Sequence, residues 1–288
     1  MQVHLFDGTY ELFRAWFGAP PQQHEGREVA ATRTFLRSLA MLLRSGKVTH
    51  GGVAFDHVIE SFRNDLFAGY KTGEGLDERL VAQFPLVERA AAALGLQVWP
   101  MIEFEADDAI ATAAARAAAD SRVEQVRICA VDKDMCQCVI GTRVVEWDRW
   151  KDVTLDEPGV GAKFGVVPAS IPDLLALVGD TADGIPGLDG WGKSSAAKVL
   201  TVFGHIQDIP DDPAMWKGVA VRGADKLAAS LRENREAAML YQKLATLRTD
   251  CPITCDVDAL AWRGPDKDAL AALCDEIGLP ADSVRVSG

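Results

Sequence analysis

Nine carboxylate side chains stand beside apolar segments of this 288-residue chain, where an isolated surface charge would not be expected. They are Asp7, Asp56, Glu105, Asp107, Asp108, Asp132, Asp134, Asp180 and Asp183. Carboxylates gathered at the ends of buried elements cannot all stay ionised close together without cations. Because hard oxygen ligands suit Mg²⁺ or Mn²⁺, the pattern predicts a divalent metal site, with a phosphodiester as the substrate class.

Each acidic motif also has a simpler interpretation. Asp132-Lys133-Asp134 places two carboxylates on one face of an extended chain, but such triplets are common in turns. The acids of Glu105-Ala106-Asp107-Asp108 could cap a helix and offset its dipole. Capping needs one or two acids, and it does not explain why Asp7 and Asp56 also end predicted strands. The motifs therefore favour a metal site in combination, not singly.

A glycine-rich segment, Gly179 to Ala196, leads into a predicted helix. Its backbone amides and the helix N-terminus could hold a phosphate without any readout of base sequence. The spacing from Gly187 to Ser194 can be aligned with a P-loop, but no strand is predicted before it, so that motif is rejected. An ordinary turn between two helices is the alternative interpretation.

Strands and helices alternate over the first part of the chain. Strands are predicted over residues 3–6, 52–55, 96–99 and 126–131, helices over 29–43, 84–95 and 105–119, and a hairpin over 144–147 and 152–154. Since each strand is followed by an acid, we expect an α/β fold with a mainly parallel sheet and the site at the strand tips. After Pro168 the chain is predicted to be helical over 172–178, 193–203, 224–247 and 266–277, and residues 251–262 are ambiguous.

Composition limits the classes of protein to consider. Hydrophobic residues make up 48%, no apolar stretch is long enough to span a bilayer, and the first residues are predicted to form a strand and not a signal peptide. The six cysteines do not suggest a disulfide framework. We therefore expect a reduced cytoplasmic protein with no membrane partner. A net charge of −12 argues mildly against a general DNA-coating protein.

Five segments of the chain together resemble the bacterial 5′ nuclease family, which comprises the 5′–3′ exonuclease domain of DNA polymerase I and free-standing flap endonucleases. The segments, in family order, are Asp7-Gly8 with Arg14; Phe55-Asp56 with Ser61-Phe62-Arg63 and Tyr70-Lys71; Glu105 to Asp108; Asp132-Lys133-Asp134; and Gly179 to Ala196. They cover the chain through residue 210, whereas the last 80 residues match only loosely. No polymerase domain follows in the sequence, so the resemblance is to the free-standing, bacterial form.

This resemblance implies a PIN-like 5′ nuclease core over residues 1–168, with a helical arch at 70–85. It also implies a helical region over 169–288 that contains a helix–two-turn–helix module at 172–203, gripping duplex DNA, with K⁺ at its loop. The implied DNA-binding residues are Tyr70, Gly187, Gly190, Trp191, Gly192, Lys193 and Ser194. Tyr70 would stack on an unpaired base near the cut, and Trp191 would be presented by the loop.

The resemblance further implies two or more Mg²⁺ or Mn²⁺ ions. One ion would be held by Asp7, Asp56, Glu105 and Asp107, and the other by Asp107, Asp132, Asp134 and one of Asp180 or Asp183, with Asp108 in an outer shell. Metals about 3.5 to 4 Å apart activate water and stabilise the leaving oxygen of a phosphodiester. Arg14, Arg63 and Lys71 would orient the scissile phosphate as catalytic residues.

The implied substrate is DNA with a 5′ flap, or a 5′ end at a duplex junction, cut during replication and repair alongside DNA polymerase and ligase. We expect a monomer associated with the bacterial nucleoid. Two features depart from the family: the segment 72–79 is short and acidic, and Asp189 replaces a usual proline. Two other functions stay open: a PIN-type ribonuclease, and a catalytically weak or silent protein that binds branched DNA.

Overall fold

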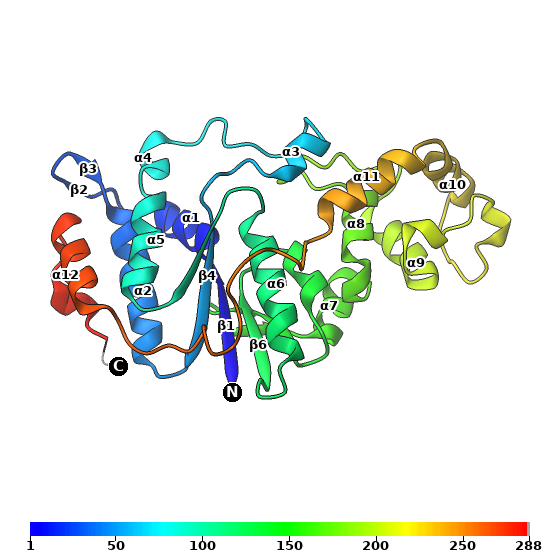
Figure 1. The fold of residues 1–288 in the computed structure, drawn as a ribbon. Helices are drawn as coiled ribbons and strands as arrows, with labels where there is room; N and C mark the ends of the chain where they lie inside the picture. Colours follow the sequence, from blue (N-terminus) through cyan, green and yellow to red (C-terminus); the bar gives the residue numbers. More distant parts are fainter. Residues whose placement is uncertain (287–288) are drawn as a thin grey trace. The chain divides into compact units, whose positions relative to one another are not determined.

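A four-stranded parallel sheet forms the centre of the first of two units in the computed structural model, which describes residues 1–286 (Figure 1). Unit 1 comprises Met1–Ser61, Gly73–Ala130 and Arg248–Gly288, and unit 2 comprises Phe62–Thr72 and Val131–Leu247. Residues 287 and 288, which end the predicted helical region 169–288, lie outside the described residues. Each unit is described below by itself.

The sheet of unit 1 has the strand order β5-β4-β1-β6, and its neighbouring strands are parallel. Its strands are β1 (Gln2–Asp7), β4 (His50–Asp56), β5 (Gln97–Met101) and β6 (Gln125–Cys129). Val3, Leu5, Val53 and Ile128 are fully buried, as expected of parallel strands covered on both faces. The predicted parallel sheet is thus confirmed, and its C-terminal edge carries Asp7 and Asp56.

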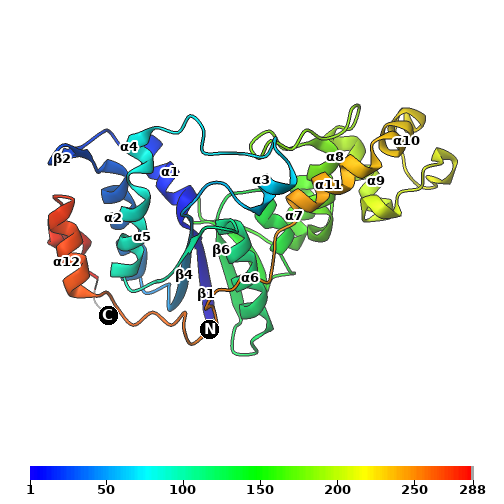
Figure 2. The same ribbon diagram turned by 45° about the horizontal axis from the view of Figure 1, so that its top comes forward.

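Helices cover both faces of this sheet (Figures 1 and 2). The helices of unit 1 are α1 (Gly8–Gly18), α2 (Ala30–Arg44), α4 (Glu78–Val81), α5 (Phe84–Ala93), α6 (Ala106–Ala119) and α12 (Lys267–Glu276), which packs against α5; the unit also has the small hairpin β2 (Gln23–His24) and β3 (Arg27–Glu28), and the 3₁₀ turn η5 (Ala281–Val284). Right-handed crossovers place α1, α2 and α5 on one face and α6 on the other. The alanines of α6 allow it to approach the strands closely: Ala109, Ala113 and Ala117 are fully buried.

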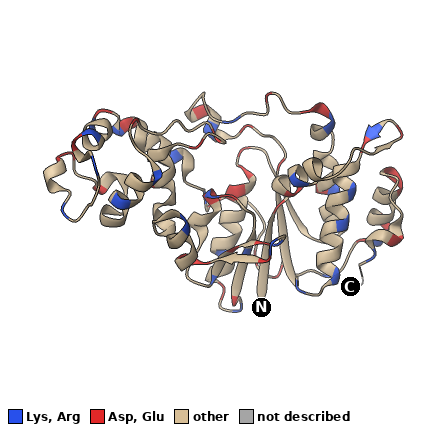
Figure 3. Cartoon of the chain, turned by 180° about the vertical axis from the view of Figure 1, so that it is seen from behind, with Lys and Arg blue, Asp and Glu red and all other residues tan. Residues whose placement is uncertain are grey.

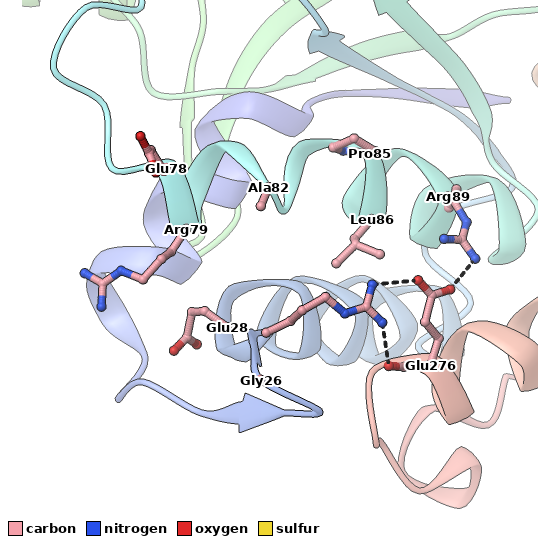
Figure 4. Close-up of a pocket in the computed structure, with 10 residues that line it drawn as sticks. Gly26, Glu28, Glu78, Arg79, Ala82, Pro85, Leu86, Arg89 and Glu276 are labelled. Atoms are coloured by element: carbon pink, nitrogen blue, oxygen red, sulfur yellow. Dashed lines mark hydrogen bonds and ion pairs between the residues drawn. The ribbon is translucent and has the colours of Figure 1, made fainter.

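Helix α12 is joined to the rest of unit 1 through Glu276. One carboxylate oxygen accepts from Arg27 (3.2 Å) and the other from Arg89 on α5 (2.6 Å). These residues line a groove of about 450 Å³ between the β2–β3 hairpin, α5 and α12, and Figure 4 shows Glu276 directed toward both guanidinium groups. The last helix of the chain is therefore held by a shared ion pair as well as by apolar packing.

Unit 2 is mostly helical. Its elements are α3 (Phe62–Leu66), η1 (Asp134–Cys138), β7 (Val144–Asp148), β8 (Val153–Leu155), α7 (Glu157–Phe164), η2 (Pro168–Ser170), α8 (Ile171–Val178), α9 (Lys193–Phe203), η3 (Ile206–Asp208), η4 (Pro213–Met215), α10 (Ala224–Glu233) and α11 (Arg235–Ala245). Strands β7 and β8 form the predicted antiparallel hairpin, with Trp147 opposite Thr154. A continuous apolar core, including Leu174, Leu177 and Val199, joins α8 and α9.

Several elements differ from the predictions. The helix expected over 224–247 is broken at Asn234, whose side-chain amide donates to the carbonyl of Ser230 (2.9 Å) and so competes with the helical hydrogen bonds. No helix was predicted directly after the first strand, but helix α1 begins at Gly8, with Asp7 as its N-cap. Residues 70–77 of the predicted helical arch (70–85) are not helical, and the short helix α4 follows them.

Among residues 1–286, no single helix is both long and apolar enough to cross a membrane. One bent pair, Glu157–Phe164 with Pro168–Val178, meets that test on length and composition alone.

Candidate active site

Two of the predicted carboxylates end neighbouring strands of unit 1. Asp7 ends β1 and caps α1, because its Oδ1 accepts the backbone N–H of Tyr10 (2.8 Å). Asp56 ends β4, and its Oδ1 accepts the backbone N–H of Ala106 at the start of α6 (2.8 Å). The amide of Asp56 donates to the hydroxyl of Thr9 (2.8 Å). The tip of β4 is therefore hydrogen-bonded to the first turns of both α1 and α6.

Three further acids lie at the N-terminus of α6, where Figure 3 shows an acidic first turn. Glu105 is the N-cap, and its Oε1 accepts the hydroxyl proton of Ser61 (2.7 Å). Asp107 is half-buried. Asp108 is fully buried: one oxygen accepts the amide of Glu105 (3.0 Å) and the other the amide of Arg248 (2.8 Å). The capping interpretation therefore describes Asp108, because both of its carboxylate oxygens accept backbone N–H groups.

The described part of the chain contains one set of three carboxylates whose ligand atoms all lie within 4.8 Å of one another. It consists of Asp134, Asp180 and Asp183, and all three side chains are buried in unit 2. The five acids of unit 1 do not form such a set among residues 1–286. Asp132 lies beside the set, because its Oδ1 accepts the backbone N–H of Asp134 (3.2 Å), and its own side chain is exposed.

Asp134 has the least compensated carboxylate of this cluster. Its Oδ1 is buried and has no hydrogen-bond partner within residues 1–286. Burial, and then the negative charges of Asp132 and Asp183, raise the pKa of Asp134 well above its usual value. A buried carboxylate oxygen without a donor is the feature that a bound cation would satisfy.

Two lysines lie against the other two carboxylates. Nζ of Lys71 is 3.0 Å from Oδ1 of Asp183, and Nζ of Lys133 is 2.5 Å from Oδ2 of Asp180. Burial raises the pKa of Asp183, but the charges of Lys71 and Lys133 and the hydrogen bonds with Lys71 and Asp134 together outweigh burial and leave that pKa below its usual value. Burial lowers the pKa of Lys133, but the hydrogen bond to Asp180 and the negative charges of Asp180, Asp134 and Asp132 together outweigh burial, so its pKa is raised.

A tight loop between α8 and α9 presents Asp180 and Asp183. Asp180 and Ile185 exchange backbone hydrogen bonds of 2.7 and 2.8 Å, which close the loop. Gly184 has φ +74°, and a Cβ atom there would lie 2.1 Å from the carbonyl oxygen of Gly69. Next to this close approach, the amide of Lys71 donates to the carbonyl of Asp183 (3.0 Å). The glycine thus allows the Lys71 segment and the loop to come together.

The N-terminus of α9 leaves most of the residues that were predicted to bind DNA there open to solvent. Gly190, Gly192, Lys193 and Ser194 are exposed, and Gly187 is half-buried. The hydroxyl of Ser195 accepts from the amide of Gly192 (3.0 Å), which caps the helix from within. The amides of the first turn and the Lys193 side chain can therefore meet an anion from solvent.

Three predicted roles are contradicted by burial. Arg63 is 1% exposed, and its guanidinium donates to the carbonyls of Leu244 (2.8 Å) and Thr246 (3.1 Å), so it cannot orient a phosphate. Tyr70 is 5% exposed within the core of unit 2, which prevents its ring from stacking on a base. Trp191 is also 5% exposed and packs against Trp216, with ring centroids 6.2 Å apart, so the loop does not present it to DNA.

Arg14 and Lys71 keep side chains that reach solvent. Arg14 is exposed on α1, one turn beyond the Asp7 cap, and Lys71 is half-buried beside Asp183. Both positions are compatible with phosphate contact, whereas that of Arg63 is not.

Sequence reasoning gave no role to Lys133, Ser61 or Glu146. Lys133 stands inside the Asp132-Lys133-Asp134 motif, so its position between two acids was the available signal. Ser61 lies far in sequence from Glu105, to which it donates. The thiol of Cys136 donates to Glu146 (2.9 Å), and burial raises the pKa of Glu146 to about 7. Neither of these last two contacts has a signature in the sequence.

Two consecutive segments of the chain match descriptions of one exonuclease family. Residues 2–165 match "5'-3' exonuclease, N-terminal resolvase-like domain", and residues 166–268 match "5'-3' exonuclease, C-terminal SAM fold". Similar proteins include DNA polymerase I of Bacillus caldotenax, 34% identical over 280 residues, which are 95% of this chain and 31% of that protein. DNA polymerase I of Pseudomonas aeruginosa is 35% identical over 283 residues, 95% of this chain and 30% of that protein. The chain thus spans about a third of the length of these relatives.

Solved structures share the fold. The T5 D15 protein co-crystallised with metal ions has a TM-score of 0.70 at 19% identity, covering 99% of this chain and 100% of that one. The T5 D15 flap endonuclease in a pseudo-enzyme-product complex with DNA and metal ions has a TM-score of 0.65 at 18% identity, with 99% and 96% covered. The catalytic core of Rad2 with DNA substrate has a TM-score of 0.63 at 16% identity, with 98% and 89% covered. The predicted fold class, a PIN-like sheet with a helical C-terminal region, is confirmed.

Proposed function

We propose a function for this chain that starts from its family: the chain belongs to the 5′–3′ exonuclease family. The proposed function is that of a structure-specific, divalent-metal-dependent 5′ nuclease that hydrolyses DNA phosphodiesters. The observation that carries this proposal is the buried set Asp134, Asp180 and Asp183, with the unpartnered Oδ1 of Asp134. Three buried carboxylates cost too much free energy to serve as packing alone, so a cation-binding role explains them better.

The donor set fits Mg²⁺ or Mn²⁺. All of its ligand atoms are carboxylate oxygens, which these hard ions prefer over nitrogen or sulfur. We propose that Asp134, Asp180 and Asp183, with Asp132, supply one group of ligands. Unit 1 would supply another at its strand tips and helix start: Asp7, Asp56, Glu105 and Asp107. When bound, such ions lower the pKa of water and stabilise the leaving oxygen of a phosphodiester.

The chain's own side chains would then bind and orient the substrate. Lys71 and Arg14 are the cations that remain able to contact the scissile phosphate. The exposed first turn of α9, with Lys193 and Ser194, would hold the backbone of duplex DNA without reading its sequence. Backbone carbonyls of the same loop would hold K⁺ in this proposal.

The relatives support a proposal for the substrate and its cellular setting. Two relatives are DNA polymerase I, and the T5 D15 flap endonuclease is described in complex with DNA and metal ions. We propose that the substrate is DNA with a 5′ flap or a 5′ end at a duplex junction. The protein would act as a monomer in a bacterial cell, close to the nucleoid and alongside DNA polymerase and ligase.

The test is cleavage of a labelled 5′-flap duplex in Mn²⁺ by the wild type, Asp132→Ala and Asp258→Ala. Losing one ligand of a metal that contributes several kcal/mol should lower the cleavage rate at least about 100-fold for Asp132→Ala. Binding of the flap DNA, measured by anisotropy in Ca²⁺, should stay near wild type. Asp258 is exposed and pairs with Arg122, so Asp258→Ala controls for the loss of a surface carboxylate.

Wild-type rates from Asp132→Ala would remove this residue from the mechanism. A single-stranded RNA, assayed under the same conditions, distinguishes the alternative of a PIN-type ribonuclease: faster RNA than flap cleavage would favour it. Flap binding by the wild type without cleavage in either Mg²⁺ or Mn²⁺ would favour the silent DNA-binding alternative.

A further inference from the structure

Lys133 lies where a metal ion would otherwise supply positive charge. Its Nζ is 2.5 Å from Oδ2 of Asp180, a side chain that is only 2% exposed. Asp180 and Asp183 each face one ammonium group, from Lys133 and Lys71, while Oδ1 of Asp134 has no partner in the described chain. The buried cluster thus holds two monovalent positive charges against three carboxylates.

Oδ1 of Asp180 already accepts the backbone N–H of Ala182 (3.1 Å), so a divalent ion would compete with the Lys133 ammonium for Oδ2. Coordination by Asp180 requires a carboxylate lone pair and a contact near 2.1 Å for Mg²⁺. An ammonium left 2.5 Å from that oxygen would lie within a few ångströms of the ion, where like charges repel by several kcal/mol even at an effective dielectric constant near 20. Metal binding to Asp180 therefore requires Lys133 to leave.

The local geometry lets Lys133 do so. Its backbone is helical (φ −62°, ψ −28°) at the start of η1, and 36% of its side chain is exposed, so the ammonium can turn into solvent without moving the neighbouring acids. Lys71 is less exposed, at 29% of its side chain, and its own amide donates to the carbonyl of Asp183 (3.0 Å), which fixes its backbone beside the acid that it pairs with. The Lys133 ammonium is therefore the more readily displaced of the two.

We propose that Lys133 is a built-in counter-cation of the metal site. Its ammonium group neutralises Asp180 in the metal-free protein and leaves Asp180 when a divalent ion binds. Because the ion must displace this ammonium group, Lys133 lowers the affinity of the site for the ion. The inference rests on the proposed metal site and adds a role for a residue of this chain. Its consequence is a trade-off. The lysine stabilises the metal-free cluster and, by the same contact, raises the metal concentration needed for loading.

The first test measures Mn²⁺ binding, without DNA, by titration calorimetry of the full chain. Lys133→Met removes the competing ammonium group, so the affinity for Mn²⁺ should rise about tenfold, which is a typical size for the effect of one bound group on the affinity for another. The same variant without metal should unfold at a lower temperature, since Asp180 is left uncompensated. Lys133→Arg keeps the charge and should stay near wild type in both measurements.

Lys151→Met is the matched control. Lys151 lies in the same unit and pairs with Asp148 (3.5 Å), but its side chain is 77% exposed, so its removal should change neither Mn²⁺ affinity nor thermal stability. If Lys133 had only a structural role, Lys133→Met would lower thermal stability without raising the affinity for Mn²⁺. Weaker or unchanged Mn²⁺ binding by Lys133→Met would overturn the proposal.

The second test uses the wild type and so does not depend on how the variant folds. Reductive methylation of lysines, quantified by mass spectrometry with and without Mn²⁺, should show Lys133 reacting faster when metal is present, with Lys151 unchanged. A Lys133 that is equally or less reactive in Mn²⁺ would reject the displacement. If the wild type binds no Mn²⁺ at all, the proposed metal-dependent function fails; if it binds but Lys133 does not respond, only the present inference fails.

Discussion

Arg63 illustrates how the role of a residue depends on what its side chain touches. Its guanidinium donates to two carbonyls just at and beyond the end of α11, where the partial negative charge of a helix C-terminus favours a cation. The Phe62 ring lies 4.6 Å from Cζ. At the level of sequence, the resemblance to the 5′ nuclease family implied that Arg63 orients a phosphate. The carbonyls that it binds are about 180 residues away, so no local pattern could reveal them.

We expect Arg63→Met to lower the free energy of unfolding by about 3 kcal/mol, because two buried carbonyls lose their donors. Arg63→Lys should recover part of the loss, since an ammonium can meet one carbonyl but lacks the fork that meets both. Arg14→Met, on the exposed surface of α1, should cost less than about 1 kcal/mol. Urea denaturation followed by circular dichroism gives all three values. Equal losses at positions 14 and 63 would show that Arg63 is not a structural cation.

The loop between α8 and α9 shows the same dependence at the scale of an element. Its chain must turn sharply enough to place Asp180 and Asp183 together, and it does so where Gly184 meets the carbonyl of Gly69. The glycine spacing alone predicts a turn that can hold phosphate. It does not show that one glycine serves to let a second chain segment approach.

We expect Gly184→Ala to lower the free energy of unfolding by about 3 kcal/mol, from the left-handed backbone together with the clash. Gly190→Ala, at a similar φ of +82° but where a Cβ atom would make only an ordinary contact, 4.0 Å from Cδ2 of Leu227, should cost about 1 kcal/mol from backbone strain alone. Mn²⁺ affinity should fall for Gly184→Ala and stay unchanged for Gly190→Ala, because only the first displaces Asp180 and Asp183. Comparable stability losses for both alanines would contradict the packing role of Gly184.

Some elements could be predicted from sequence because their signals are local. Parallel strands buried on both faces are continuous apolar runs, and the acids that begin α6 mark its N-terminus, so both were placed within a few residues. Helix α1 was missed because Asp7-Gly8 is typical of a turn. A Cβ atom at Gly8 would lie 2.2 Å from the Phe55 ring, so the glycine is there for packing against β4.

The division of the acids between structure and chemistry could not be predicted. Asp107 and Asp108 are neighbours of the same type, and Asp108 is identified as a structural carboxylate by the amides of Glu105 and of Arg248, which lies 140 residues away. Burial of Tyr70 and Trp191 likewise depends on the assembled core of unit 2. Residue type predicted where acids gather, and tertiary contacts decide what each one does.

At the scale of the whole molecule, one buried group in each unit makes stability depend on pH, and the two dependences have opposite signs. In unit 1, His4 is 1% exposed within β1, and burial lowers its pKa from 6.5 to about 4. Between about pH 6.5 and 4 the unfolded chain therefore binds a proton at His4 that the folded chain does not bind. The free energy of unfolding falls as the pH falls through this range. In unit 2, burial raises the pKa of Glu146 to about 7, so the folded chain keeps a proton and stability is lost as the pH rises from about 4.5 to 7.

We expect His4→Gln to remove the acid sensitivity that arises in unit 1. The shift of His4 corresponds to at most about 3 kcal/mol, present above pH 6.5 and absent below pH 4. Stability of the variant, measured by urea denaturation at pH 4.5 and 7.5, should therefore fall less on acidification than that of the wild type. Glu146→Gln removes the opposing contribution, so its stability should fall more steeply over the same interval. Parallel pH profiles for the wild type and His4→Gln would mean that the pKa of the imidazole is the same in the folded and the unfolded chain.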